Sequence, residues 1–216
     1  QVHLRRGFFW YYLQRHSSVP SVQRLHDEPI SRIHMRSPDE HLFRVQARDT
    51  TIAIDFSHVL TDGSGAMRFL STLVAEYLRQ RGESIPAGGL VLDPAEPPQD
   101  GEFEDAFRTL YRKESPPPEK LSPAYHIPGP MGGRYYRTLT ARMPINKILT
   151  LARERRVSLT EYLVGVYLHA LIIMHDRDRS RRHTIRIEVP VDLRRIHASP
   201  TMRNFSLFVS PEIDLR

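Results

Sequence analysis

One segment of the chain, TIAIDFSHVLTDGSGAMRFLSTLVAEYL (51–78), changes its hydrophobic period halfway along. Residues Ile52–Phe56 alternate with a period of two, which is typical of a half-buried strand. After Gly63 the apolar residues recur every third or fourth position, which indicates an amphipathic helix. The segment therefore predicts a strand, a short turn and a helix, with His58 at the strand end and Asp62 in the turn.

Composition narrows the classes of protein that fit. The 216 residues include no cysteine, which excludes a disulfide framework and a thiolate zinc site. Apolar residues make up 40% of the chain, enough for a core. The formal charge of +6 leaves an anionic partner open. We see no signal peptide and no apolar run of membrane-spanning length, and we expect a cytoplasmic protein.

Strand and helix patterns along the rest of the chain indicate an α/β or α+β layered fold. Strands are expected at 41–47, 51–59, 134–144, 184–195 and 204–215, and helices after Gly63, at Glu102–Lys113, at Ile145–Arg156 and from Thr160 to about His175. Residues 83–133 are rich in Pro and Gly and are otherwise irregular, and RDRSRR (177–182) is a charged link.

Local signals assign further roles. Ser64 is expected to cap the helix after Gly63, and Gly82 to end it. Ser158 or Thr160 should cap the helix that begins near residue 160. The aromatic run FFWYYL (8–13) is expected in the core, as a strand or a short helix. His169, on an apolar helix face, is expected to be a buried core histidine, whereas His126, His175 and His197 carry no signal of a partner.

The spacing of His58 and Asp62 alone leaves several interpretations open. Both residues could be purely structural, since Asp-Gly is a favourable turn. A metal site would need a further ligand at matching spacing, so we expect none. A serine hydrolase would need a nucleophile elbow, and GSG (63–65) lacks that pattern. The remaining interpretation is a general base, because a neutral imidazole can take a proton from an alcohol or amine.

At this point the sequence resembles a known group. SHVLTDG resembles the H-x-x-x-D-G signature of the acyltransferase superfamily that includes chloramphenicol acetyltransferase, condensation domains and alcohol acetyltransferases. VPVDLRR and TMRNFSLFV resemble a downstream arginine strand and Asn-Phe strand of these enzymes. GFFWYYL and EDAFRTLYRK are most similar to the alcohol acetyltransferase-like branch. Many condensation domains have two consecutive histidines in this motif, whereas here Ser57 precedes the single histidine. In this respect the motif resembles that of the branch that uses coenzyme A.

The resemblance implies roles for individual residues. His58 would be the general base. Asp62 would form a structural ion pair with Arg194, with Arg195 as the next choice, and Gly63 would allow a close backbone turn. Asn204 and Ser206 are candidates for contacting the oxyanion or the substrate.

The resemblance also implies an activity and a set of partners. We expect a chloramphenicol acetyltransferase-like fold that moves an acyl group, expected to be acetyl, from acyl-CoA (acetyl-CoA) to a small-molecule alcohol or amine, with no covalently bound cofactor. The alternatives are a condensation-type domain that uses carrier-protein-bound donors, or a catalytically silent binding or regulatory relative. Nucleic-acid binding is not expected, because the basic residues are scattered.

The resemblance to this superfamily also implies domain limits. Residues 1–176 would form the N-terminal subdomain, 177–182 the charged link, and 183–216 the start of a C-terminal subdomain. Because the enzymes of this group are built from two halves around a tunnel, we expect a fragment that is inactive alone. It would need its missing C-terminal half or a second copy to pair its strands.

Overall fold

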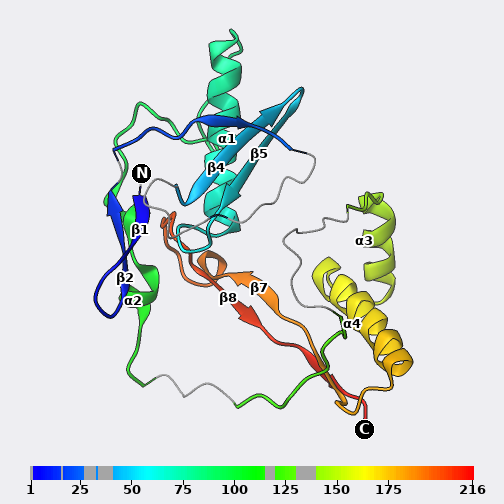
Figure 1. Ribbon diagram of the computed structural model, residues 1–216. Helices are drawn as coiled ribbons and strands as arrows, with labels where there is room; N and C mark the ends of the chain where they lie inside the picture. Colours follow the sequence, from blue (N-terminus) through cyan, green and yellow to red (C-terminus); the bar gives the residue numbers. More distant parts are fainter. Residues whose placement is uncertain (1, 16, 27–32, 34–40, 115–119, 130–139) are drawn as a thin grey trace. The chain divides into compact units, whose positions relative to one another are not determined.

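The computed structural model describes residues 2–15, 17–26, 33, 41–114, 120–129 and 140–216. These residues form a mixed α/β structure with small sheets (Figure 1). The chain divides into two compact units, the first comprising Gln1–Ser115 and Asp192–Leu207 and the second Pro116–Val191 and Phe208–Arg216. The subdomain limits drawn around 177–182 stay a prediction, although Arg177 and Asp178 belong to a helix rather than to a link.

The first unit contains the strand–turn–helix segment. Its elements are β1 (Val2–Arg6), β2 (Tyr11–Arg15), β3 (Val22–Arg24), β4 (Phe43–Arg48), β5 (Thr51–Phe56), α1 (Gly63–Gln80), the 3-10 helix η1 (Asp100–Phe103), α2 (Ala106–Leu110) and the 3-10 helix η2 (Leu193–Arg195). The helix expected at Glu102–Lys113 is thus reduced to α2, with η1 before it.

The β4–β5 hairpin and α1 pack through aromatic side chains. β4 pairs antiparallel with β5 and parallel with β3. Phe43 lies opposite Phe56 in the register, and their ring centroids are 5.6 Å apart. Phe69 of α1 meets both rings edge-on, at 5.5 and 5.4 Å. The apolar face of the strand and that of the helix therefore meet as their two periods predict, and Gly82, with φ of 93°, follows the end of α1 as expected.

The aromatic run at 8–13 is not in the core, which corrects the expectation above. β1 and β2 form an antiparallel hairpin, and the Gly7 N–H donates to the Trp10 carbonyl at 2.6 Å to close its turn. The chain reversal places Phe8, Phe9 and Trp10 at the apex, where they are 85%, 84% and 63% exposed. Burial of an apolar run is favourable, but the run becomes buried only if other elements pack against it.

The second unit is built around two helices and two short strands. Its elements are α3 (Ile145–Glu154), α4 (Leu159–Asp178), β6 (Thr184–Arg186) and β9 (Glu212–Asp214). Its core consists of Tyr125, Leu168, Leu171 and Ile185. β6 pairs antiparallel with β9. The strand expected at 134–144 falls mostly outside the described residues, and residues 140–144 are irregular.

Two further short strands form a sheet of their own: β7 (Val189–Asp192) pairs with β8 (Ser206–Val209). The strands expected at 184–195 and 204–215 are therefore each split into two short strands.

Polar groups at both ends of α4 fix its limits. Ser158 and Glu161 form a reciprocal capping box at its start, so the cap is Ser158 rather than Thr160. Near its other end, the buried His175 contacts the Arg182 carbonyl through Nε2 at 3.1 Å. His175 thus has partners that the sequence did not indicate, and the histidine expected in the core, His169, is instead exposed.

The Tyr125 hydroxyl donates a hydrogen bond to the Asp178 carboxylate, which, with burial, raises the pKa of Tyr125 to about 12. Since the folded pKa lies above the ordinary value of 10.0, this stabilisation is complete below pH 10 and is lost as pH rises towards 12. We expect Tyr125→Phe to lower the melting temperature by a few degrees at neutral pH. The difference from the wild type should shrink at alkaline pH. Tyr167→Phe, on an exposed side chain of α4, is the matched control, and equal melting temperatures for Tyr125→Phe and wild type at pH 7 would contradict the prediction.

Candidate functional site

The turn between β5 and α1 presents His58 and buries its neighbours. The Ser57 N–H donates to the Leu42 carbonyl at 2.7 Å, and the Leu60 N–H donates to the Ser57 carbonyl at 2.9 Å. Ser57 and Asp62 are buried, whereas His58 is exposed. The strand therefore ends in a hydrogen-bonded turn that carries the imidazole outward.

Asp62 is the N-cap of α1, which corrects the assignment of the cap to Ser64. Its Oδ1 accepts hydrogen bonds from the Ser64 and Gly65 N–H groups, each at 3.1 Å. Aspartate and serine are both good caps, and here the residue with the charge takes the cap position. Ser64 instead donates its hydroxyl to Asp192 at 2.5 Å.

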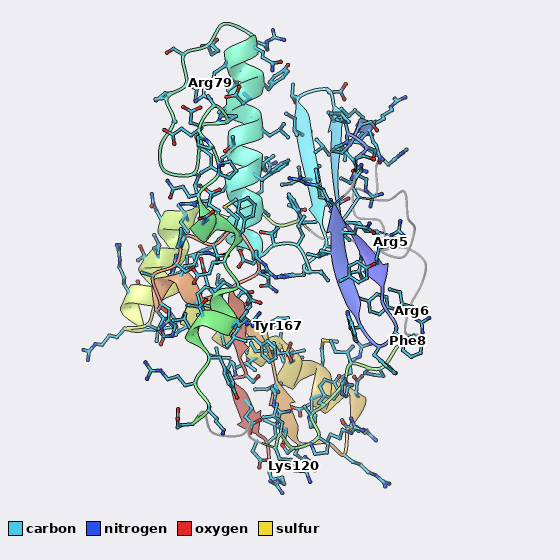
Figure 2. All side chains as sticks on the ribbon, turned by 90° about the vertical axis from the view of Figure 1, so that its left-hand side faces the viewer. Arg5, Arg6, Phe8, Arg79, Lys120 and Tyr167 are labelled. Atoms are coloured by element: carbon cyan, nitrogen blue, oxygen red, sulfur yellow. The ribbon has the colours of Figure 1, made fainter. Side chains whose placement is uncertain are left out.

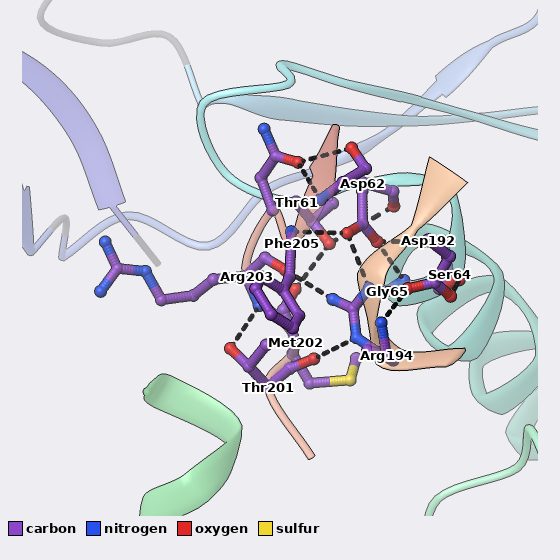
Figure 3. A network of polar contacts seen from close by, with 12 residues as sticks. Thr61, Asp62, Ser64, Gly65, Asp192, Arg194, Thr201, Met202, Arg203 and Phe205 are labelled. Carbon is purple, nitrogen blue, oxygen red and sulfur yellow. Dashed lines mark hydrogen bonds and ion pairs between the residues drawn. The ribbon is translucent and has the colours of Figure 1, made fainter. Parts of the chain in front are cut away.

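The second oxygen of Asp62 ties distant segments to the helix start (Figure 3). Asp62 Oδ2 accepts from Arg194 Nη1 at 2.8 Å and from the Phe205 N–H at 2.7 Å. The ion pair expected between Asp62 and Arg194 is thus present. Each carboxylate oxygen has two donors, so Asp62 has no acceptor left for His58.

All three side-chain nitrogens of Arg194 donate hydrogen bonds. Its Nη1 also binds Asp192 Oδ1 at 2.9 Å, its Nε donates to the Thr201 carbonyl at 2.9 Å, and its Nη2 donates to the Arg203 carbonyl at 2.6 Å. Only 16% of the Arg194 side chain is exposed. A planar guanidinium with five donors suits this position, where a lysine could not reach so many acceptors.

Asp192 is a member of the network that the sequence did not predict. It accepts from Ser64 with one oxygen and from Arg194 with the other, so it links the first turn of α1 to η2. Its place two residues before Arg194 in VDLRR is the signal that could have identified it. Thr61 is a second such residue, since its hydroxyl donates to the Met202 carbonyl at 2.7 Å.

The close backbone approach lies at Gly65 rather than Gly63. A Cβ at Gly65 would lie 2.1 Å from Thr61 Oγ1 and 2.6 Å from the Met202 carbonyl oxygen. A Cβ at Gly63 would meet nothing within 4 Å. Sterics therefore demand the second glycine of TDGSG, where the helix start passes closest to the Met202 backbone.

The network fixes the charges of its members. Burial alone would raise the pKa of Asp62, but the hydrogen bonds from Phe205, Arg194 and Gly65 outweigh it, and the pKa lies below its ordinary value. The pKa of Asp192 is lowered by the same balance, with Ser64 and Arg194 as donors. Burial lowers the pKa of Arg194, but the two carboxylates outweigh this and raise it. The network thus holds two carboxylates and one guanidinium, all ionised at neutral pH.

The structure places the remaining predicted residues in different surroundings. Asn204 Oδ1 accepts from both the N–H and the hydroxyl of Ser206, at 3.3 and 2.9 Å, so the two residues bond to each other at the start of β8. Arg195, the second choice as the partner of Asp62, is exposed. His58 has no hydrogen bond or ion pair with any residue that the structure describes. Roles of Asn204 and Ser206 at an oxyanion stay predictions.

An apolar groove of about 720 Å³ lies in the same unit. Leu60, from the turn that carries His58, lines it together with Leu13, Phe43 and Phe69.

Across residues 2–15, 17–26, 33, 41–114, 120–129 and 140–216, no group of three or more metal-ligating side chains is close enough to hold an ion. No single described helix could cross a membrane, and α3 with α4, bent by 86°, passes as a pair by length and composition only.

Comparison with known proteins identifies no relative: no family model, no curated protein and no solved structure matches the chain.

Loss of the Asp62 carboxylate should destabilise the first unit strongly. Asp62→Ala removes the N-cap of α1, the acceptor of the Phe205 N–H and one of the two carboxylates that pair with the buried Arg194. We therefore expect a loss of about 3–5 kcal/mol in the free energy of unfolding, measured by urea titration. Because the folded pKa lies below 3.8, this contribution is present above that pH and disappears as pH falls through the folded value. The difference between variant and wild type should therefore narrow in acid.

Asp214→Ala is the matched control, since it removes an exposed ion pair with Arg216 and should change stability little. Equal stability losses for the two variants would contradict the role assigned to Asp62.

The two glycines allow a second test. Gly65→Ala should cost about 1–3 kcal/mol, because the methyl group overlaps Thr61 and a backbone carbonyl that cannot both move. Gly63→Ala should be neutral or slightly stabilising, because the site is open and alanine limits the unfolded chain. Thermal and urea unfolding of both variants measure the difference, and the reverse order of stability would show that the close approach is not as described.

Proposed function

We propose that the chain carries the general-base half of an acyltransferase site, with His58 as the base, and that its fold is chloramphenicol acetyltransferase-like. The observation that carries the proposal is the division of roles within SHVLTDG. Asp62 is buried and fully used by Arg194, Phe205 and the helix start, while His58 stands exposed at the strand end. The motif thus holds the turn through Asp62 and leaves the imidazole of His58 accessible. A general base must be accessible in this way, because it has to come within hydrogen-bonding distance of the proton that it takes.

The chemistry needs only one side chain from this turn. His58 takes the proton of an acceptor hydroxyl or amine, while the oxygen or nitrogen of that acceptor attacks the carbonyl carbon of a thioester. The tetrahedral intermediate then collapses, the C–S bond breaks, and the leaving thiolate takes the proton from His58. The products are an ester or amide and a free thiol, and no acyl-enzyme forms.

The apolar groove offers a place for the apolar part of a substrate. Leu60 lines this groove and His58 does not, but the two residues belong to the same turn. The acyl chain or the acceptor would lie in the groove and extend past Leu60 to the imidazole. Acyl-CoA is the proposed donor. The Asp62–Arg194–Asp192 network contacts neither substrate and positions the turn.

The decisive experiment follows thiol release with acetyl-CoA and longer acyl-CoA donors and a panel of alcohols and amines, on the polypeptide in its natural length. His58→Ala should lower the rate by about two to four powers of ten, the usual contribution of a general base, without loss of secondary structure. His197→Ala, another exposed histidine of the first unit, should leave the rate unchanged. Full activity in His58→Ala would refute the proposed base.

A donor series separates the alternatives. Transfer from carrier-bound acyl groups but not from acyl-CoA would assign the chain to the condensation type. The absence of transfer from either kind of donor would contradict an enzymatic role.

A further inference from the structure

The apex of the β1–β2 hairpin is an aromatic cluster in solvent. Phe8, Phe9 and Trp10 are 85%, 84% and 63% exposed, and the Phe8 and Phe9 rings meet edge-on at 4.6 Å. Figure 2 shows Phe8 at the turn of the hairpin, with Arg6 close by on β1. Three consecutive aromatic side chains at this exposure form a contiguous apolar tip, unlike the single apolar residues common on protein surfaces. The hydrogen bond from the Gly7 N–H to the Trp10 carbonyl closes the turn that carries this tip, and the Trp10 indole lies close to Gly7.

The arms of the hairpin carry only positive charge. Arg5 and Arg6 of β1 pair in the register with Tyr12 and Tyr11 of β2, and Arg15 ends β2. All three arginines are exposed, and residues 2–15 include no aspartate or glutamate. Strand residues advance by about 3.3 Å each, so Arg5 and Arg6 stand within about 10 Å of the turn. The hairpin therefore combines an apolar apex with a cationic collar.

We propose that the β1–β2 hairpin is an interfacial anchor that inserts Phe8, Phe9 and Trp10 into an anionic lipid surface. Aromatic side chains favour the membrane interface, where their rings leave water. Arginines at the level of the headgroups gain from the negative surface potential of anionic lipids. The inference is independent of the acyltransferase proposal, because none of these residues belongs to the Asp62 network or to the turn of His58.

Two other occupants fit the tip less well. A second copy of the chain would bring arginines of both hairpins together with no carboxylate from either hairpin between them. Single-stranded nucleic acid stacks its bases on aromatic faces that present a continuous platform. The planes of Phe8 and Phe9 are inclined by 83°, so they do not form such a platform.

Trp10 makes the test direct, because it is the single tryptophan of the chain. The full chain is titrated with vesicles of phosphatidylcholine and phosphatidylserine, and with vesicles of phosphatidylcholine alone, while tryptophan emission is recorded. We expect an emission maximum typical of exposed tryptophan without vesicles, and a blue shift with the anionic vesicles that salt weakens.

Matched variants separate the apolar and the cationic contributions. Phe8→Ser/Phe9→Ser keeps the reporter and should weaken binding at least about tenfold, whereas Tyr111→Ser, on another exposed aromatic residue, should not. Arg6→Glu/Arg15→Glu should weaken binding by at least about fivefold per arginine. Lys147→Glu/Arg153→Glu makes the same change in net charge on exposed positions of α3 and should have little effect. Circular dichroism checks that each variant keeps its fold. If Phe8→Ser/Phe9→Ser does not fold, the single variant Phe8→Ser replaces it in the titration.

Several outcomes overturn the proposal. These are no blue shift with anionic vesicles, an equal shift with phosphatidylcholine alone, and a blue-shifted emission before any vesicle is added. A shift that depends on protein concentration, with sedimentation of a dimer, would assign the tip to a second copy. A change in emission with a single-stranded oligonucleotide but not with vesicles would assign it to nucleic acid.

Discussion

The carboxylate of Asp62 is the group on which the first unit depends. Through four hydrogen bonds it caps α1, holds the guanidinium of Arg194 and binds the backbone of Phe205. Arg194 and Phe205 are 132 and 143 residues from Asp62 in the sequence, so the carboxylate joins the start of α1 to a distant segment of the chain. Buried ion pairs stabilise only when their remaining donors and acceptors are satisfied, and here Arg194 finds carbonyl and carboxylate partners for its other nitrogens.

The geometry of this network explains why a histidine and an aspartate four residues apart need not touch. A strand end and a helix start are joined by a turn, and the turn directs one side chain inward and the other outward. Burial and a lowered pKa mark Asp62 as fixed and ionised. His58 is exposed, so the reactivity proposed for it would come from position rather than from a carboxylate partner.

The sequence predicted this part of the fold well because periodicity and sterics act locally. The change from period two to period three or four located β5 and α1, and the resemblance to a known motif predicted the Asp62–Arg194 pair. Cap choice was wrong at Ser64, because both serine and aspartate cap helices and only the tertiary partner of each decides between them. Asp192 and Gly65 were missed for the same reason: their importance depends on a segment more than a hundred residues away.

Burial was the least predictable property. The sequence predicted Phe8, Phe9 and Trp10 to lie in the core, but all three are exposed. It also predicted a buried His169, which is exposed as well. Hydrophobicity indicates what a residue would gain from burial, whereas the arrangement of other elements determines whether burial occurs. The helix expected at Glu102–Lys113 is shortened at both ends, because Asp105 caps α2 at its start and Tyr111 after it has an extended backbone.

Few large side chains are completely buried among the described residues, and Phe205, Leu42 and Ile185 are the largest of them. With so limited an apolar core, directional polar contacts must carry a large share of the specificity of the fold. Phe205 shows how the two are combined: its ring lies in the core beside Phe107, while its N–H binds Asp62. The same residue thus joins apolar packing to the ion-pair network, so a change in either would move the turn that presents His58.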